Sequence, residues 1–192
     1  MNREQFITQF LLHQPRHKEQ DFPLLGKGRP AAVLIPLVDY GNELTVLFTQ
    51  RALHLKHHPG QISFPGGGLN EGENIFDGAM RETEEEVGIP TGQITTIGAL
   101  PNFRTISGYC VAPVVGFIAP NYPVAIDENE VSSIFEVPLP YLLNQNNHQV
   151  HYAERKGTKQ PIYFIPWQDK LIWGATASIL RNLSHLIHSE NR

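Results

Sequence analysis

The chain has 192 residues, of which 41% are hydrophobic, and its formal net charge at pH 7 is −4. Length and composition predict a single globular domain over residues 1–192, and the negative charge, with no basic stripe or aromatic platform in the sequence, argues against nucleic-acid binding. The single cysteine, Cys110, excludes an internal disulfide and a cysteine-rich zinc site, and it fits a reducing compartment, so we expect a cytoplasmic protein.

The N-terminal segment predicts a short helix and no membrane span. Charged and polar residues interrupt residues 1–20, so this segment fits neither a secretory signal nor a transmembrane helix. Its apolar residues have the spacing of an amphipathic helix at about residues 2–14, which ends before Pro15. These apolar residues are Phe6, Ile7, Phe10 and Leu11.

The middle of the chain predicts strands. An apolar run at residues 31–38 and a segment rich in strand formers at 44–49 flank a turn, so we expect them to form a hairpin in the core. Further strands are expected at residues 94–100, 111–118 and 131–137, and a late hairpin at 148–154 and 161–165 with its turn at 156–158.

The end of the chain predicts a C-terminal helix at about residues 171–188. Its apolar residues have the spacing of a helix that lies on a sheet. They are Ile172, Ala175, Ile179, Leu183 and Leu186. The sequence leaves open whether this helix covers the substrate or a partner subunit in a homodimer. It also leaves open whether Trp167 and Trp173 stack on an adenine base or lie buried in the core.

Residues 75–86 predict a helix that ends in a concentration of carboxylates. Asn74 can cap its start, and Gly88 suits a left-handed stop. Because successive helical residues are rotated by about 100°, Glu82, Glu85 and Glu86 lie on one side. The residues expected on the core side are Phe76, Ala79, Thr83 and Val87.

Negative charges near the C-terminus of a helix interact unfavourably with the helix dipole. Repulsion between Glu82 and Glu86, which are four residues apart, destabilises the helix by roughly a further 0.2–0.5 kcal/mol. Mg²⁺ or Mn²⁺, which prefer oxygen ligands, would compensate the charge. The alternative is a solvated acidic face in which Arg81 pairs with Glu85 at i+4. The charges alone do not decide between these interpretations.

Residues 67–89 fit the pattern G-x5-E-x7-R-E-U-x-E-E-x-G-U, in which U is a bulky aliphatic residue. The matching residues are Gly67, Glu73, Arg81, Glu82, Glu85, Glu86, Gly88 and Ile89. Thr83 departs from the pattern, because an aliphatic residue is expected there, but it lies on the core side. The segment resembles the Nudix box of the Nudix hydrolases.

This resemblance implies an α/β fold, an α/β/α sandwich with a mixed sheet and a loop-helix-loop catalytic motif. It also implies a reaction in which divalent metals, Mg²⁺ or Mn²⁺, help water to cleave a diphosphate. The implied metal ligands and catalytic residues are Glu82, Glu85 and Glu86, with Arg81 orienting them and Glu73 supporting the loop. We further expect the backbone at Gly66, Gly67 and Gly68 to approach the ion and substrate closely, and Gly78 to leave space for metal or phosphate.

The residues of the Nudix box do not identify the general base of the reaction. Three acidic residues precede an expected strand, and of these we favour Glu130 as a base or extra metal ligand. An exposed acidic turn is an equally good interpretation of Asp127 and Glu128.

A second motif lies upstream, where residues 47–52 lead to Lys56, Gly60 and residues 64–67. It resembles the motif of the coenzyme A diphosphatases within the Nudix family, with Phe48 in place of leucine and Lys56 in place of arginine. Arg51 and Lys56 could bind the phosphates of coenzyme A, as His57 and His58 could. The alternative is that Arg51 only packs or pairs at the end of a strand.

Three functions remain open at this point. The first is hydrolysis of coenzyme A, or an acylated or oxidised form of it, to 4′-phosphopantetheine and adenosine 3′,5′-bisphosphate, as the resemblance implies. The second is a Nudix diphosphatase for another nucleoside diphosphate derivative. The third is a non-catalytic nucleotide sensor, against which the intact set of glutamates weighs. In each case the expected partner is a small molecule.

Overall fold

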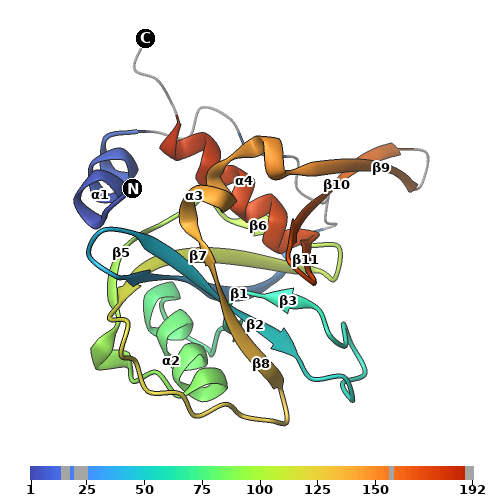
Figure 1. The fold of residues 1–192 in the computed structure, drawn as a ribbon. Coiled ribbons are helices and arrows are strands. Elements are labelled where there is room, and N and C mark those ends of the chain that lie inside the picture. The colour runs from blue at the N-terminus through green and yellow to red at the C-terminus, as the bar shows by residue number, and fades with distance from the viewer. Residues whose placement is uncertain (14–17, 20–25, 156–157, 189–192) are drawn as a thin grey trace.

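The computed structural model describes residues 1–13, 18–19, 26–155 and 158–188 (Figure 1). Its α-helices in this part of the chain are α1 (Arg3–Leu12), α2 (Ile75–Val87), α3 (Leu139–Leu143) and α4 (Ala175–Ile187). Its strands are β1 (Arg29–Asp39), β2 (Leu44–Arg51), β3 (Ile62–Ser63), β4 (Gly66–Gly68), β5 (Thr95–Ala99), β6 (Phe103–Arg104), β7 (Tyr109–Ile118), β8 (Val131–Pro138), β9 (Gln149–Arg155), β10 (Thr158–Trp167) and β11 (Lys170–Trp173). Short 3₁₀ turns lie at Thr91–Gln93 and Gln145–Asn147.

The main sheet is mixed. Its strand order is β3-β2-β1-β7-β5, and β4, β6 and β8 pair with β1, β7 and β2, respectively. Strands β1 and β7 are parallel, whereas β1 and β2 form the predicted antiparallel hairpin. The predicted late hairpin is also present as β9 and β10, which form a smaller sheet with β11. Residues 156 and 157 of its predicted turn lie outside the described residues.

Helices cover both faces of the main sheet, with α2 on one face and α1, α3 and α4 on the other (Figure 1). Strand β1 supplies both cores: Ala32 and Leu34 pack on the side of α2, while Ile35 and Leu37 pack on the side of α4. Burial on two faces explains why β1 is an almost continuous apolar run rather than an alternating pattern. The α/β/α sandwich predicted from the sequence is therefore confirmed.

The C-terminal helix begins later than predicted. Residues 171–173 belong to β11, where Ile172 pairs with Ile165 of β10, and the helix starts at Ala175. Gly174 separates the two elements with a positive φ of 68°, a conformation that suits glycine. The N-terminal helix lies at Arg3–Leu12, inside the predicted span, while Pro15 lies outside the described residues.

None of the helices in the described ranges combines the length and the apolar character that crossing a bilayer requires.

Candidate active site

Helix α2 has the ends that its sequence predicts. The Asn74 side chain accepts hydrogen bonds from the backbone N–H groups of Phe76 and Asp77, each at 2.9 Å. Gly88 ends the helix in the left-handed region, and its N–H donates to the Glu84 carbonyl at 2.9 Å. On the core side, Thr83 is buried and its hydroxyl donates to the carbonyl of residue 79 at 2.7 Å. This bond satisfies a polar side chain at a position where an aliphatic one is expected.

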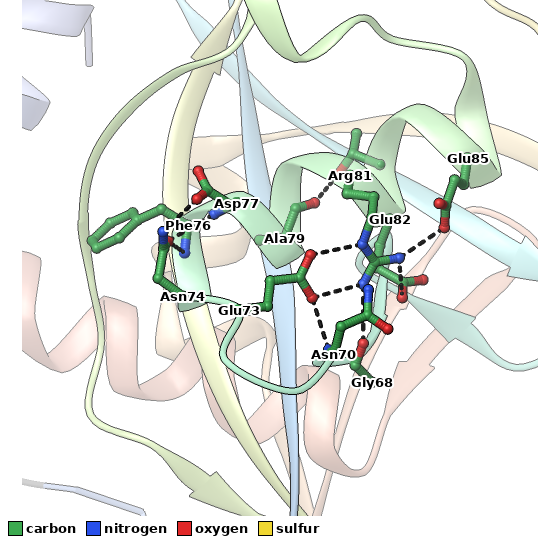
Figure 2. A network of polar contacts seen from close by, with 11 residues as sticks. Gly68, Asn70, Glu73, Asn74, Phe76, Asp77, Ala79, Arg81, Glu82 and Glu85 are labelled. Atoms are coloured by element: carbon green, nitrogen blue, oxygen red, sulfur yellow. Dashed lines mark hydrogen bonds and ion pairs between the residues drawn. The ribbon is translucent and has the colours of Figure 1, made fainter.

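Arg81 is the centre of the polar network of α2, as Figure 2 shows. Its guanidinium contacts Glu73 through Nε at 2.8 Å, and Nη1 contacts both Glu82 at 2.8 Å and Glu85 at 2.9 Å. Nη2 donates to the Gly68 carbonyl at 3.1 Å. Hydrogen bonds from Arg81 and from the backbone lower the pKa of Glu73 to about 2. Arg81 thus joins the loop before α2 to two of the three clustered glutamates.

The glycines of β4 allow the backbone to lie directly against those glutamates. A Cβ atom added to Gly67 would be 2.4 Å from Oε2 of Glu82, closer than any real contact. The Gly66 N–H donates to Oε2 of Glu86 at 3.3 Å. A Cβ at Gly66 would be 2.5 Å from the Ala32 carbonyl oxygen of β1. Side chains at either position would therefore displace a carboxylate or the neighbouring strand.

Gly78 has a different role from the predicted one. A Cβ atom at this position would be 2.2 Å from Cδ2 of Leu69 and 3.2 Å from Oε2 of Glu73. The missing side chain makes room for the loop that precedes α2. The prediction that Gly78 leaves space for metal or phosphate is therefore wrong.

Glu86 is the most strongly perturbed carboxylate of the site. It is only 6% exposed, and burial raises its pKa to about 8 against the opposing Gly66 N–H. The negative charges of Glu130 and Glu82 raise this pKa further, while the positive charge of Arg51 lowers it. Burial also raises the pKa of Glu82, against the lowering effect of Arg81. Negative charge at the end of α2 is thus incompletely compensated.

Arg51 and Glu130 reach this site from two neighbouring strand ends. Arg51 is the last residue of β2 and pairs with Val131, the first residue of β8. The Glu130 carbonyl accepts a hydrogen bond from the Ala52 N–H at 2.8 Å. Glu130, the predicted base, and Arg51, the predicted phosphate-binding residue, therefore lie next to each other. The charges of both shift the pKa of the same carboxylate, Glu86.

The other candidates lie around this centre. Asp127 is a turn residue: its carboxylate accepts from the Asn129 N–H at 3.0 Å, and its own N–H donates to the Glu86 carbonyl at 3.1 Å. Glu128 is exposed. Lys56 is also exposed, in the loop between β2 and β3.

Sequence reasoning missed two contacts, the hydrogen bond from Gly66 to Glu86 and the approach of Gly67 to Glu82. Their only signal in the sequence is the run of three glycines at residues 66–68.

The acidic residues fit a hard divalent cation through their chemistry. Within the residues that the structure describes, no three acidic, histidine or cysteine side chains converge as a ready-made metal cluster. Glu85 is 59% exposed and, like Glu82, is held by Arg81. Yet the negative charge of Glu130 raises the pKa values of both Glu82 and Glu86, and a bound cation would reverse this effect. The donors are all carboxylate oxygens, which Mg²⁺ and Mn²⁺ prefer.

The sequence profile of the NUDIX domain matches residues 28–158. The chain belongs to the Nudix family. Like other Nudix hydrolases it is an enzyme that acts on diphosphate bonds, and members of the family generally use divalent metal ions. The substrates of Nudix enzymes are small nucleotide molecules.

Relatives cover nearly the whole of this Nudix hydrolase. A protein of Escherichia coli O7:K1, named uncharacterized Nudix hydrolase NudL, is 36% identical over 182 residues, which cover 94% of this chain and 92% of the relative. A protein of Shigella flexneri with the same name is 37% identical over the same shares of the two chains.

Solved structures of Nudix hydrolases share the fold. A binary complex of a C. elegans Ap4A hydrolase has a TM-score of 0.50 and 20% identity, covering 57% of this chain and 80% of the other. The M. smegmatis Nudix hydrolase RenU has a TM-score of 0.50 and 22% identity, covering 58% of this chain and 71% of the other. At these identities the two structures bear on the fold alone.

Proposed function

We propose that this Nudix hydrolase cleaves the diphosphate of coenzyme A, or of its derivatives, to 4′-phosphopantetheine and adenosine 3′,5′-bisphosphate. The observation that supports it most is the position of Arg51, which belongs to the upstream motif but acts on Glu86 of the Nudix box. A guanidinium beside the carboxylates is suited to bind a phosphate of the substrate, because its planar fork can donate two parallel hydrogen bonds. The match to the relatives named NudL covers 94% of the chain, so it includes both the upstream motif and the Nudix box.

The proposed metal ligands are Glu82, Glu85 and Glu86, which would hold Mg²⁺ or Mn²⁺. When bound, such ions neutralise charge on the diphosphate and lower the pKa of water. Arg81 orients Glu82 and Glu85 through its Nη1 group, so that both carboxylates face the same region. Exchange of these contacts for metal contacts would leave Arg81 held by Glu73 at 2.8 Å.

Glu130 is the proposed general base or additional ligand. Its carboxylate is exposed, and its charge acts on both Glu82 and Glu86, so it is close to the place where water would attack. It would accept the proton of the attacking water. Gly66 and Gly67 hold Glu86 and Glu82 against the backbone of β4, which limits the positions that the two carboxylates can take.

Lys56 is proposed to contact the 3′-phosphate of coenzyme A. Its long side chain is exposed in the loop that directly follows Arg51 and Ala52. The same exposure also favours a second candidate, a Nudix diphosphatase for another nucleoside diphosphate derivative, because an exposed lysine need not contact the substrate at all. In both cases we propose a cytoplasmic, single-domain enzyme.

The experiment is incubation of the purified protein with coenzyme A and either Mg²⁺ or Mn²⁺, with products identified by mass and a metal-free control. Metal-dependent 4′-phosphopantetheine and adenosine 3′,5′-bisphosphate would establish the activity. Absence of these products from folded protein would turn attention to other nucleoside diphosphates.

The same assay with dephospho-coenzyme A separates the two candidates. If Lys56 pairs the 3′-phosphate, Lys56→Gln should raise KM for coenzyme A and leave KM for the dephospho form unchanged. Arg51→Gln should weaken the turnover of both substrates. Equal effects of Lys56→Gln on the two substrates would contradict the assignment of Lys56.

A further inference from the structure

A pocket of ≈ 410 Å³ lies between the segment at residues 58–61, the turn between β6 and β7, the β9–β10 hairpin and the start of α4. The mechanism proposed above uses none of its lining residues. Ile106 is 53% exposed and Trp173 is 38% exposed, although both are large apolar side chains. Apolar side chains that remain exposed around a hollow mark a binding site for an apolar ligand.

One wall of this pocket is joined to the catalytic site through Arg51. The Arg51 N–H donates to the Gln61 carbonyl at 2.9 Å, and the Gly60 N–H donates to the Arg51 carbonyl at 3.1 Å. Gln61 lines the pocket, while the charge of Arg51 acts on Glu86. Arg51 therefore contacts the pocket wall through its backbone, and its positive charge is felt at Glu86.

The other wall lies at a defined distance from β4. Arg104 lines the pocket and pairs with Cys110 of β7. Cys110 in turn pairs with Pro30 of β1. The Pro30 carbonyl accepts a hydrogen bond from the N–H of Leu69, which directly follows β4. Neighbouring strands are about 4.8 Å apart, so three such steps place the pocket wall roughly 14 Å from the glycines of β4. The pocket wall at Arg104 is thus roughly 14 Å from the strand whose glycines lie against Glu82 and Glu86.

The pocket is apolar and carries no excess of positive charge. Phe103, Ile106, Ile162 and Trp173 contribute its large apolar side chains. Apart from a histidine, its charged side chains are Arg104 and Glu154, which are opposite in sign. A carboxylate in the lining disfavours a phosphate, so the half of coenzyme A that carries the 3′-phosphate suits this pocket poorly.

We propose that this pocket binds the uncharged arm of the substrate, the pantetheine chain together with an acyl group on its sulfur. The inference rests on the proposed function. From its first carbon to its sulfur the pantetheine chain has about twelve atoms, as many as four extended residues, or roughly 13–14 Å. That length equals the separation between β4 and the pocket wall. The enzyme consequently favours acyl-coenzyme A over coenzyme A, and Ile106 and Trp173 set this preference.

The test compares KM for coenzyme A and octanoyl-coenzyme A, with Mg²⁺, in the full chain and in two variants. Each methylene that enters an apolar pocket strengthens binding about fourfold, so the wild type should show a KM at least tenfold lower for the octanoyl form. Ile106→Asp should remove this difference, because it should raise KM for octanoyl-coenzyme A at least tenfold more than KM for coenzyme A. Val124→Asp is the matched control, because Val124 is 52% exposed and does not line the pocket.

Trp173→Ala provides a second variant, which removes apolar surface without adding charge and should reduce the preference in the same direction. Hydrolysis of coenzyme A with equal KM values for both substrates would overturn the pocket assignment and leave the proposed function intact. A preference for the octanoyl form that Ile106→Asp and Trp173→Ala leave unchanged would also overturn it. Failure of the folded wild type to hydrolyse either substrate would refute the proposed function and this inference together.

Discussion

The contact between Gly67 and Glu82 leads to a prediction whose size follows from the structure. In Gly67→Ala, the new methyl group would be 2.4 Å from Oε2 and 2.7 Å from Oε1 of Glu82. Ordinary contacts begin at about 3.4 Å, so the carboxylate must move away by about 1 Å. A misplacement of about 1 Å in a catalytic site can cost roughly 100-fold in rate. We therefore expect kcat to fall between about tenfold and 100-fold.

Stability should change little in Gly67→Ala, because the displaced atoms are the end of a flexible side chain. The assay measures kcat at saturating substrate and Mg²⁺, together with the thermal unfolding midpoint. Gly68→Ala is the matched control, since a Cβ atom there meets nothing within 4 Å. The reasoning is refuted if Gly67→Ala keeps more than half of the wild-type kcat, or if Gly68→Ala loses as much activity as Gly67→Ala.

Three further substitutions test the acidic residues. Glu86→Gln should lower metal-dependent kcat by more than tenfold. Thermal stability should not fall, because the substitution removes a charge that burial disfavours. A smaller loss of kcat would contradict the role of Glu86 as a metal ligand. Glu130→Gln should lower kcat and alter its pH profile, and normal turnover across the pH range would exclude Glu130 from the mechanism. Glu19→Gln tests a structural carboxylate: burial raises the pKa of Glu19, but hydrogen bonds from Tyr163 and from Arg181 outweigh it and lower the pKa to about 2. Because this pKa is depressed, Glu19 stabilises the fold by about 3 kcal/mol above its unfolded pKa, and this contribution disappears as the pH falls toward 2. Urea unfolding should thus show a difference between wild type and Glu19→Gln that is largest near neutral pH and shrinks in acid; a constant difference would contradict the assignment.

The elements that the sequence predicted well are those that local interactions determine. Helix α2 begins after Asn74 and ends before Gly88, because both residues act within one helical turn of the backbone groups they satisfy. The ion pair of Arg81 with Glu85 is likewise local, since residues four apart share a helix face. The hairpin of β1 and β2 follows from two apolar segments and a short turn between them.

The errors arose where local patterns suit more than one structure. Leu171 and Ile172 fit the helical spacing that continues to Leu186, but pairing with β10 places them in a strand. Gly78 is adjacent to the acidic cluster along the helix, yet the contact that requires a glycine there comes from Leu69 of the preceding loop. In both cases the deciding neighbour lies on another element.

The sequence by itself determined the family, the helix that carries the glutamates and the chemistry expected of them, because these depend on residue types at short and fixed spacings. Only the tertiary structure decided which distant residues join them. Arg51 and Glu130 meet at Glu86 through the register of β2 and β8, and no periodicity along the chain encodes that register. The apolar pocket likewise depends on the packing of four separate segments, so its existence and its separation from β4 follow only from the folded chain.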